Sequence, residues 1–507
     1  MIQEDYKLKI GNLIQETRQS KGLTQTQLAQ ELGTSQSAIN RIEKGGQNIS
    51  LEMLARISDV LSKELVSLNR AGKTNFRING GKKLSGEIAV KTSKNAAVGL
   101  LCASLLNKGK TTLKRVARIE EVNRIIEVLN SIGVKTRWLE NNDLEIIPPK
   151  RLKLEDMDIE AAKRTRTIIM FLGPLTHQFK EFKLPFAGGC SIGTRTVEPH
   201  ISVLRHFGLE VEATADYYSA TMKPRKVDEI IVLTERGNTV SENILMAAAM
   251  YDGTTTIHNI NNEYMVQDLC LFLQKLGVKI DGFGTNKLVV RGLRSINKNV
   301  EYYPSEDPIE AMSLLAAGIV TKSDMTIKRA PIEFLEIEMA LLEDMGLKFT
   351  VSDRYPARNG ITQLADIHIM PSNLKAPKDK LHCYPSAVNM DNLPFLGLIA
   401  TVAEGRTLIH DWSYENRAIY FTELSKLNAT VELVDPHRVY VTGPTKWKPA
   451  DIIAPPALRP SVVILLAMLA APGQSTLRDV YSINRGYEDF ANRLNKLGAD
   501  IETLREI

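Results

Sequence analysis

One cysteine of this chain lies in a glycine-rich run that ends in an arginine. Cys190 belongs to the run AGGCSIGTR, whose last residue is Arg195. Glycines allow a loop to bend sharply, and a guanidinium group lowers the pKa of a nearby thiol and binds phosphate or carboxylate groups. A lone cysteine is more often a small buried apolar side chain. The run therefore indicates a reactive thiol only if charged residues elsewhere in the chain converge on it.

Such residues stand at or near the starts of long apolar runs, and they are Lys94, Arg166, Asp307, Asp391 and Arg459. A cation near the start of a helix binds anions together with the free N–H groups of that helix. A carboxylate there either transfers protons in a reaction or simply caps the helix. The matched positions predict that these side chains meet at one anionic site.

The positions match because the chain after its first seventy-five residues is a sixfold repeat. Each copy has an apolar helix-like run, a short strand, an amphipathic helix and a second strand. The apolar runs begin near Lys94, Arg166, Ser241, Ile309, Asp391 and Arg459. The amphipathic helices end at residues that tolerate a left-handed backbone, which are Gly133, Gly208, Gly277, Gly346, Asn428 and Gly498. Each apolar run is expected to be buried on all sides.

Length, charge and cysteine usage set limits on the protein class. A chain of 507 residues is expected to form two or three domains. A net charge of +5 suits anionic partners without requiring nucleic acid. The four scattered cysteines argue against a disulfide framework or a zinc site, and they predict a reducing, cytoplasmic location. The longest apolar run, 462–471, is too short to span a bilayer, and the polar N-terminus is no signal peptide, so no membrane partner is expected.

The first seventy residues form a separate helical unit in this interpretation. Thr24 is the expected cap of one short helix and Gly33 its end, and a second helix follows almost at once. This arrangement, with the phrases LTQTQLA and SAINRIEKG, resembles the lambda-repressor-like helix-turn-helix family. The resemblance implies binding of double-stranded DNA, with the dimer as the binding species, through Gln25, Ser35, Gln36, Ser37 and Arg41. The alternative is a protein–protein or dimerisation module.

The body of the chain, from Phe76 onwards, resembles the enolpyruvyl transferase family. The resemblance is carried by the run SKNAA at Lys94, the cysteine loop, the run SEDPIE around Asp307, and Arg459. It implies an α/β fold in which six units form a two-globe inside-out barrel, with helices inside, after the small all-α domain. The expected divisions are 1–68 for the helix-turn-helix domain, 69–75 for a linker, 93–265 for the first globe, and 76–92 with 266–507 for the second.

The family transfers the enolpyruvyl group of phosphoenolpyruvate to a hydroxyl group by addition and elimination, and phosphate leaves. The cysteine loop is typical of the amino-sugar branch, whose acceptor is the 3′-hydroxyl of UDP-N-acetylglucosamine and whose product is a peptidoglycan precursor. No cofactor and no metal are expected. The loop cysteine of this branch protonates the methylene carbon or forms a covalent adduct, and it is alkylated by fosfomycin.

The resemblance assigns roles to individual residues. The implied catalytic residues are Cys190, Asp307 and Asp391. The implied phosphoenolpyruvate-binding residues are Lys94, Arg166, Arg195 and Arg459. The implied nucleotide-sugar-binding residues are Asn95, Val197, Glu198, His200, Arg236, Asn238, Thr239, Asp268 and Asp307. Two further segments, around Arg417 and Arg485, are expected to order the cleft.

Three departures from the family pattern leave the acceptor open. The stretch that touches the UDP phosphates reads RGNTV from Arg236, Pro308 follows Asp307, and VNMD precedes the fifth apolar run. Another nucleotide or sugar therefore remains an alternative acceptor. A second alternative is a DNA-binding regulator whose body senses a nucleotide sugar without turnover.

Overall fold

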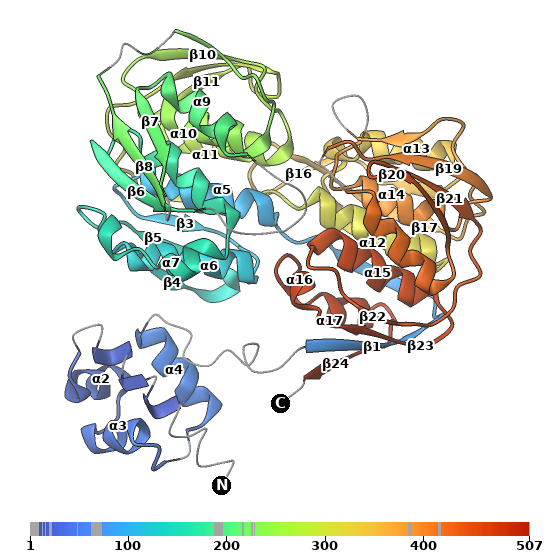
Figure 1. Ribbon diagram of the computed structural model, residues 1–507, viewed down its shortest axis with the longest axis horizontal. Helices are drawn as coiled ribbons and strands as arrows, with labels where there is room; N and C mark the ends of the chain where they lie inside the picture. Colours follow the sequence, from blue (N-terminus) through green and yellow to red (C-terminus); the bar gives the residue numbers. More distant parts are fainter. Residues whose placement is uncertain are drawn as a thin grey trace. The chain divides into compact units, whose positions relative to one another are not determined.

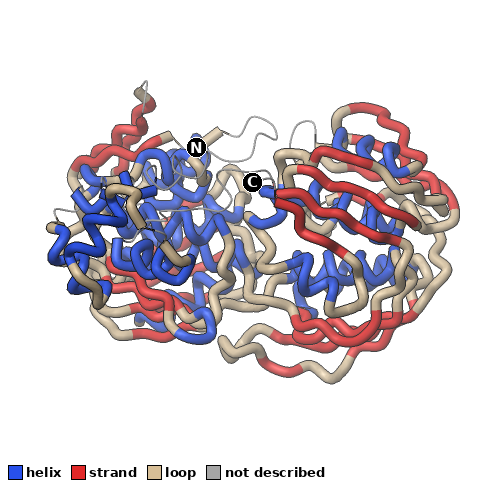
Figure 2. The backbone as a smooth tube through the Cα atoms, turned by 90° about the horizontal axis from the view of Figure 1, so that it is seen from below, coloured by secondary structure: helices blue, strands red, loops and turns tan. Residues whose placement is uncertain are grey.

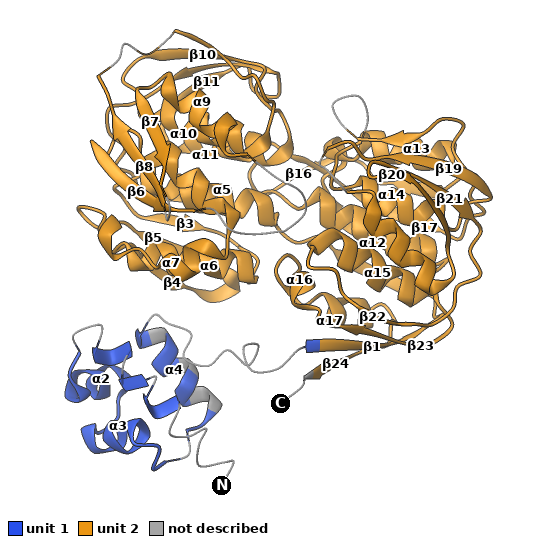
Figure 3. Ribbon diagram, in the orientation of Figure 1, with its two compact units in different colours: residues 1–74, 505–507 blue, residues 75–504 orange. Residues whose placement is uncertain are grey.

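A computed structural model describes residues 10–505, apart from 13, 16, 20–22, 48, 62–73, 187–195, 215–216, 225–226, 228, 384–387 and 414–416. Cys190 and Arg195, and with them the expected reactive loop, lie outside the described residues. The chain forms two compact units, residues 1–74 with 505–507 and residues 75–504 (Figure 3).

The smaller unit contains the two helices that the sequence predicts, and a third follows them. They are α2 (Gln25–Leu32), α3 (Gln36–Glu43) and α4 (Leu51–Leu61). Thr24 caps α2 through a capping box, and Gly33 ends it with a φ of 64°, as expected. Leu28, Leu32 and Ile39 are fully or almost fully buried in a small apolar core, so the helical spacing of these residues is what holds the unit together.

The larger unit has two lobes, which we define by the pairing of their strands (Figure 1). The sheets of the first lobe are β13-β3-β5-β4, β6-β8-β7 and β11-β12-β10-β9. Their bounds are β3 (Thr111–Leu113), β4 (Lys135–Trp138), β5 (Leu144–Ile147), β6 (Glu181–Pro185), β7 (Leu209–Ala213), β8 (Tyr217–Met222), β9 (Ile230–Val232), β10 (Thr254–His258), β11 (Lys279–Asp281), β12 (Lys287–Arg291) and β13 (Val300–Tyr302).

The sheets of the second lobe are β15-β17-β14-β2, β18-β19-β21-β20 and β22-β23-β1-β24, with β16 paired to β17. Their bounds are β1 (Thr74–Gly80), β2 (Ser85–Ala89), β14 (Asp324–Ala330), β15 (Lys348–Val351), β16 (Tyr355–Pro356), β17 (Gln363–Met370), β18 (Leu381–His382), β19 (Gly405–His410), β20 (Thr430–Asp435), β21 (Arg438–Gly443), β22 (Asp451–Ile453), β23 (Gly473–Arg478) and β24 (Ile501–Arg505).

The helices of each lobe lie inside its sheets, which Figure 2 shows most clearly in the lobe on the right. In the first lobe they are α5 (Lys94–Ala103), α6 (Glu120–Ser131), α7 (Ile159–Lys163), η4 (Arg166–Phe171), α8 (Leu172–Leu175), α9 (Glu198–Arg205), α10 (Asn238–Ala249) and α11 (Tyr264–Leu276). In the second they are α12 (Pro308–Val320), α13 (Glu336–Asp344), α14 (Leu393–Ala400), η6 (Ile419–Leu427), α15 (Leu458–Ala470), α16 (Tyr481–Asn484) and α17 (Phe490–Asn495). Every residue of α12 is buried, as expected for a helix that is apolar on all sides. Among the residues described, no helix is long and apolar enough to cross a bilayer.

The turns that end the amphipathic helices are as predicted. All six positions have a positive φ, between 72° and 105°, and they are Gly133, Gly208, Gly277, Gly346, Asn428 and Gly498. A side chain other than glycine or asparagine is strained in this conformation. The sixfold repeat is therefore visible in the sequence, because each copy has a glycine, or in one case an asparagine, at the same turn.

The boundary between the lobes was expected after residue 265, and this expectation is wrong. Strands β11 and β12 pair with β10, and β13 pairs in parallel with β3, so residues 266–302 belong to the first lobe. The reason is that the sheet of the first copy takes its parallel edge strand from the end of the third copy. In the same way, β2 pairs in parallel with β14 and ties the N-terminal strands to the second lobe.

Two chain segments connect the lobes and lie side by side. The amide of Ser93 donates to the carbonyl of Ser305 at 2.8 Å, and the amide of Asp307 donates to the carbonyl of Lys91 at 2.9 Å. Helix α5 begins directly after the first segment, and α12 begins directly after the second. The junction therefore brings the starts of two apolar helices, more than two hundred residues apart in the sequence, next to each other.

Candidate active site

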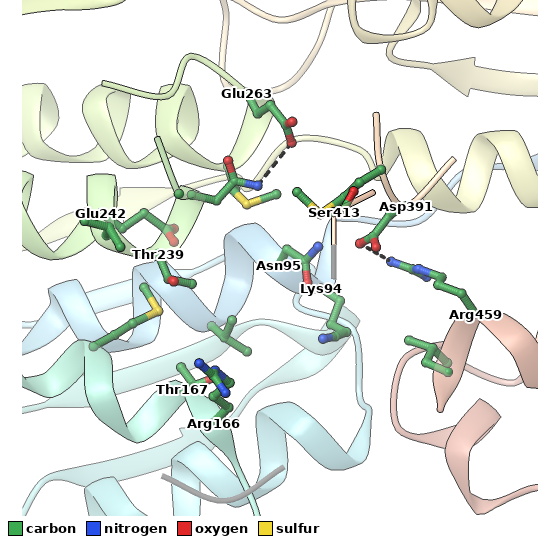
Figure 4. Close-up of a pocket in the computed structure, with 18 of the residues that line it drawn as sticks. Lys94, Asn95, Arg166, Thr167, Thr239, Glu242, Glu263, Asp391, Ser413 and Arg459 are labelled. Atoms are coloured by element: carbon green, nitrogen blue, oxygen red, sulfur yellow. Dashed lines mark hydrogen bonds and ion pairs between the residues drawn. The ribbon is translucent and has the colours of Figure 1, made fainter. Parts of the chain in front are cut away.

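A pocket of about 570 Å³ opens at this junction, a volume typical of small-molecule sites. The first lobe contributes residues of α5, α6, η4, α9, α10 and α11, and the second contributes the segment before α14 and the starts of α15 and η6. Lys94, Asn95, Arg166, Asp391 and Arg459 all line it (Figure 4). The structure therefore brings together five of the residues that the sequence singles out.

Asp307 and Lys94 meet through the junction rather than across the pocket. Asp307 caps α12, because its Oδ1 accepts from the amides of Ile309 and Glu310 at 2.8 and 3.2 Å. Its Oδ2 accepts from the amide of Lys94 at 3.2 Å. Burial raises the pKa of Asp307, although Arg459 opposes the shift. Asp307 is 7 % exposed and does not itself line the pocket, so its carboxyl group lies just behind the start of α5.

The environment of Asp307 is held by a buried ion pair. Arg493 donates two hydrogen bonds to the carboxylate of Glu310, at 2.8 and 3.0 Å, and both side chains are less than 10 % exposed. The same carboxylate accepts from the amide of Lys91 at 2.9 Å. Helix α12, α17 and the connecting segment are thereby fixed to one another, which positions the Asp307 carboxyl group.

Asp391 lies between two guanidinium groups of the second lobe. Arg459 is 3.4 Å from its Oδ2, and Arg417 is 3.3 Å from its Oδ1. Burial alone favours the protonated acid, but Arg459, Arg417 and Lys94 outweigh it and lower the pKa of Asp391 to about 2. Asp391 does not cap α14, whose cap position is Asn392. Its carboxylate is therefore ionised at neutral pH and holds two cations at the pocket wall.

Lys94 faces the pocket from the start of α5. Burial lowers the pKa of its ammonium group, and Arg459 and Arg485 lower it further, whereas Glu121 and Asp391 oppose the shift. Glu121 in turn accepts from Arg485 at 2.9 Å and from the hydroxyl of Thr165 at 2.6 Å. The pair Glu121–Arg485 also joins the two lobes beside Lys94.

His200 marks the other end of the pocket, on α9. Its Nδ1 lies 2.9 Å from the amide nitrogen of Asn243, which donates to it, so Nε2 carries the proton. Nε2 is 3.4 Å from the hydroxyl of Thr239. Burial, and the charge of Arg166, lower the pKa of His200 to about 3. This imidazole is therefore neutral at physiological pH and serves as a polar contact rather than as a cation.

The pocket carries a net positive charge although equal numbers of basic and acidic residues line it. The basic residues are Lys94, Arg166, Arg417, Arg459 and Arg485, and the acidic residues are Glu121, Glu235, Glu242, Glu263 and Asp391. Burial raises the pKa of Glu242 to about 8 and that of Glu263 to about 7. Because these two carboxyl groups are wholly or partly protonated at pH 7, cations outnumber anions, and the pocket suits an anionic substrate.

Five residues predicted for nucleotide-sugar binding do not line the pocket, and one of them is Asp307, described above. Glu198 is exposed and pairs with Arg205, Val197 precedes α9 away from the wall, and Arg236 donates to the carbonyl of Ile260. Asp268 is fully buried, where it accepts hydrogen bonds from Ser305 and from the hydroxyl of Tyr302. Asp268 therefore anchors the segment that leads to Asp307, because its position on α11 faces the lobe junction.

Sequence reasoning missed several pocket residues, among them Glu121, Glu242, Glu263 and Tyr264. Glu263 accepts from Asn238 of the first lobe at 3.1 Å and from Asn389 of the second at 2.9 Å. An acidic residue inside an apolar helix is the signal that was available for Glu242, since burying a carboxyl group is costly without a purpose.

In the smaller unit, most residues expected to contact DNA lie at the starts of α2 and α3, and Arg41 lies in the last turn of α3. Ser35, Gln36, Ser37 and Arg41 are exposed. The side-chain amide of Gln36 donates to the side-chain oxygen of Gln25 at 2.5 Å. The side-chain amide of Gln25 donates in turn to the buried carboxylate of Glu43. The second helix of the pair therefore presents polar side chains to solvent, in the arrangement of a helix-turn-helix.

Comparisons with known proteins agree with this fold. A family model described as EPSP synthase (3-phosphoshikimate 1-carboxyvinyltransferase) matches residues 78–494, and a helix-turn-helix model matches residues 14–68. The two-lobed body therefore belongs to the enolpyruvyl transferase family.

The curated relatives carry a more particular name. A UDP-N-acetylglucosamine 1-carboxyvinyltransferase of Bradyrhizobium diazoefficiens is 34% identical over 440 residues, which are 85% of this chain and 98% of that protein. The protein of the same name from Dichelobacter nodosus is 31% identical over 438 residues, 85% of this chain and 99% of its own length. Among solved structures, the enolpyruvyl transferase NikO from Streptomyces tendae has a TM-score of 0.75 at 23% identity, over 86% of this chain and 100% of that one, which shows the fold.

Proposed function

We propose that this protein transfers the enolpyruvyl group of phosphoenolpyruvate to the 3′-hydroxyl of UDP-N-acetylglucosamine and releases phosphate. One observation carries the proposal: Lys94, Arg166 and Arg459 surround a pocket at the lobe junction, with the carboxylate of Asp391 among them. The substrate has one phosphate and one carboxylate, and guanidinium groups bind both groups bidentately. The name shared by the curated relatives supports this acceptor.

The reaction needs proton transfers at the acceptor oxygen and at C3 of phosphoenolpyruvate, two atoms that both bond to C2 in the addition intermediate. In the addition step, the acceptor oxygen bonds to C2 of phosphoenolpyruvate and gives up its proton, and C3 gains a proton to become a methyl group. In the elimination step, C3 loses a proton, the C2–O bond to phosphate breaks, and phosphate leaves. We assign Asp307 as the base for the hydroxyl group, Cys190 as the proton donor to C3, and Asp391 to the proton transfers of the elimination.

The cations stabilise the charge that collects during these steps. Lys94, Arg166, Arg195 and Arg459 are assigned to phosphoenolpyruvate, and Asn95, His200, Asn238 and Thr239 to the nucleotide sugar. A low-dielectric pocket strengthens each of these interactions. The ionised state of Asp391 holds Arg459 in place at neutral pH, which orients its guanidinium group before substrate binds.

Phosphate release from a mixture of the two substrates tests the proposal. The wild-type protein should release phosphate only when both are present, and Cys190→Ala should reduce the rate by on the order of 10²-fold or more, as loss of a proton donor does. Cys383→Ala, which removes a buried thiol outside the pocket, is the matched control and should leave the rate unchanged. Fosfomycin should add its mass to Cys190 alone. Absence of phosphate release with a panel of nucleotide sugars would refute the proposal, and release only with another acceptor would replace the acceptor.

We infer a second function, DNA binding, for the helix-turn-helix unit. The exposed polar side chains of α3 and the match of residues 14–68 to a helix-turn-helix family support it. A pool of random DNA duplexes selected for binding to the full-length protein should become enriched in one sequence that contains two copies of a half-site. The reason is that a dimer binds two half-sites. Arg41→Ala should weaken binding of that duplex about tenfold in a fluorescence anisotropy titration. Absence of any enriched sequence would refute DNA binding and favour a protein-interaction module.

A further inference from the structure

We propose that Glu242 determines acceptor specificity by donating a hydrogen bond from a neutral carboxyl group to an amide or imide carbonyl of the acceptor substrate. This inference rests on the proposed function, since it concerns the acceptor half of the same pocket. Glu242 lies on α10, one turn after Thr239, and both side chains point into the pocket (Figure 4). No step of the transfer reaction described above uses it.

The carboxyl group of Glu242 is buried, and one of its two oxygens has no hydrogen-bond partner among the described residues. The residue is 1 % exposed, and its Oε1 has no hydrogen-bond partner in the part of the chain that the structure describes. A carboxyl group left in this state costs free energy, so it is rare in a folded protein without a ligand that completes it. The pocket is the open side of this group, because helices α5, α8, α9 and α11 pack around α10.

The opposite helix is shaped to leave room for this side chain. A Cβ atom at Gly99 of α5 would lie 2.2 Å from Oε1 of Glu242, far inside the contact distance of the two atoms. Only glycine at position 99 allows the carboxyl group to lie where it does. Gly99 stands one turn after Asn95 on α5, so the Glu242 carboxyl group lies about one helical turn from Asn95, which lines the pocket.

The surroundings keep this group neutral. Burial, and the charge of Asp268 on α11, raise the pKa of Glu242 to about 8. Its other titratable neighbours are the thiols of Cys102 on α5 and Cys270 on α11, and the pKa of each is raised, so both are uncharged. Lys94, Arg166 and the neutral His200 complete the pocket around it.

A neutral carboxyl group has one donor and one acceptor on adjacent oxygens. It therefore matches a group that offers a carbonyl oxygen beside an N–H. The proposed acceptor has two such groups, the acetamido group of its sugar and the imide of its uracil. An ionised carboxylate would lack the donor and would repel the phosphates of the nucleotide, so protonation is part of the recognition.

The test compares Glu242→Gln with Glu242→Val by calorimetric titration of UDP-N-acetylglucosamine, UDP-glucose and UMP, and by the KM for phosphoenolpyruvate. Valine removes the hydrogen bond, so the Kd of UDP-N-acetylglucosamine should rise about tenfold, with the KM for phosphoenolpyruvate unchanged. Glutamine keeps a donor and an acceptor and should bind nearly as the wild type does. If UDP-glucose is weakened equally, the contact is with uracil; if it is unaffected, the contact is with the acetamido group.

The pH dependence separates recognition from a merely structural role. Wild-type affinity should fall as pH rises through about 8, because the carboxyl group loses its proton, whereas Glu242→Gln should show no such fall. Thermal unfolding of both variants checks that they fold, and the glutamine variant alone is sufficient for the pH comparison. Identical pH profiles for the wild type and Glu242→Gln, or unchanged binding of every ligand by Glu242→Val, would overturn the inference. If the wild type releases no phosphate with UDP-N-acetylglucosamine, the proposed function fails separately, and the Glu242 comparison is read from UMP, which carries the imide alone.

Discussion

Arg459→Met is expected to lower kcat/KM for phosphoenolpyruvate by on the order of 10³-fold, the loss typical of removing one preorganised charge donor from an active site. The side chain of Arg459 is only 12% exposed, and its guanidinium group lies 3.4 Å from Asp391 and 3.2 Å from the hydroxyl of Tyr487. Methionine preserves most of the side-chain volume while it removes the charge. It also leaves the Asp391 carboxylate with Arg417 as its remaining guanidinium partner, so the pKa of Asp391 should rise from about 2 toward its ordinary value.

Two further variants make this result interpretable. Arg459→Lys keeps the charge but not the planar fork, and it should recover only part of the activity, because a point charge cannot bind a carboxylate or phosphate bidentately. Arg406→Met is the matched control, since Arg406 is an exposed residue of β19 that pairs with Glu432 outside the pocket. Steady-state phosphate release measures all three. Activity of Arg459→Met within tenfold of the Arg406→Met control would contradict the role given to Arg459.

Asp307→Asn is expected to lower kcat by roughly 10² to 10⁴-fold, the range for loss of a general base. Asparagine caps helices as well as aspartate does, so the cap of α12 should survive while proton transfer is lost. Asp307→Ala should lose both, and its free energy of unfolding should fall by about 1 kcal/mol more than that of the asparagine variant. Kinetics of phosphate release and chemical denaturation together separate the two roles.

The pH profile gives a second measure of the same residue. A base must be deprotonated to act, and burial raises the pKa of Asp307, so kcat/KM of the wild type should fall as pH drops through that raised value. The fall should be absent in the asparagine variant. Asp158→Asn, which changes a capping aspartate of α7 outside the pocket, is the control and should match the wild type. Full activity in Asp307→Asn would show that this aspartate is only a helix cap.

Much of the fold could be predicted because its determinants are local. The six turn residues, the Thr24 cap and the apolar helices each follow from the conformational preference or burial of a few neighbouring residues. The same is true of the cations Lys94, Arg166 and Arg459, each of which stands where an apolar run of the sequence begins. The lobe boundary was missed because β13 pairs with β3, and a pairing across nearly two hundred residues leaves no local signal.

The candidate site likewise has features that the sequence predicts and features that depend on tertiary contacts. The residue types at the start of each repeat can be read from the sequence, and with them the presence of the cations and carboxylates that the chemistry needs. Three features come from contacts between distant parts of the chain instead: Asp307 meets the amide of Lys94, Asp268 is an anchor away from the pocket, and burial favours the neutral form of Glu242. The physical reason is that ionisation and contact depend on burial and on neighbours distant in the chain, whereas caps and turns depend on neighbours a few residues away.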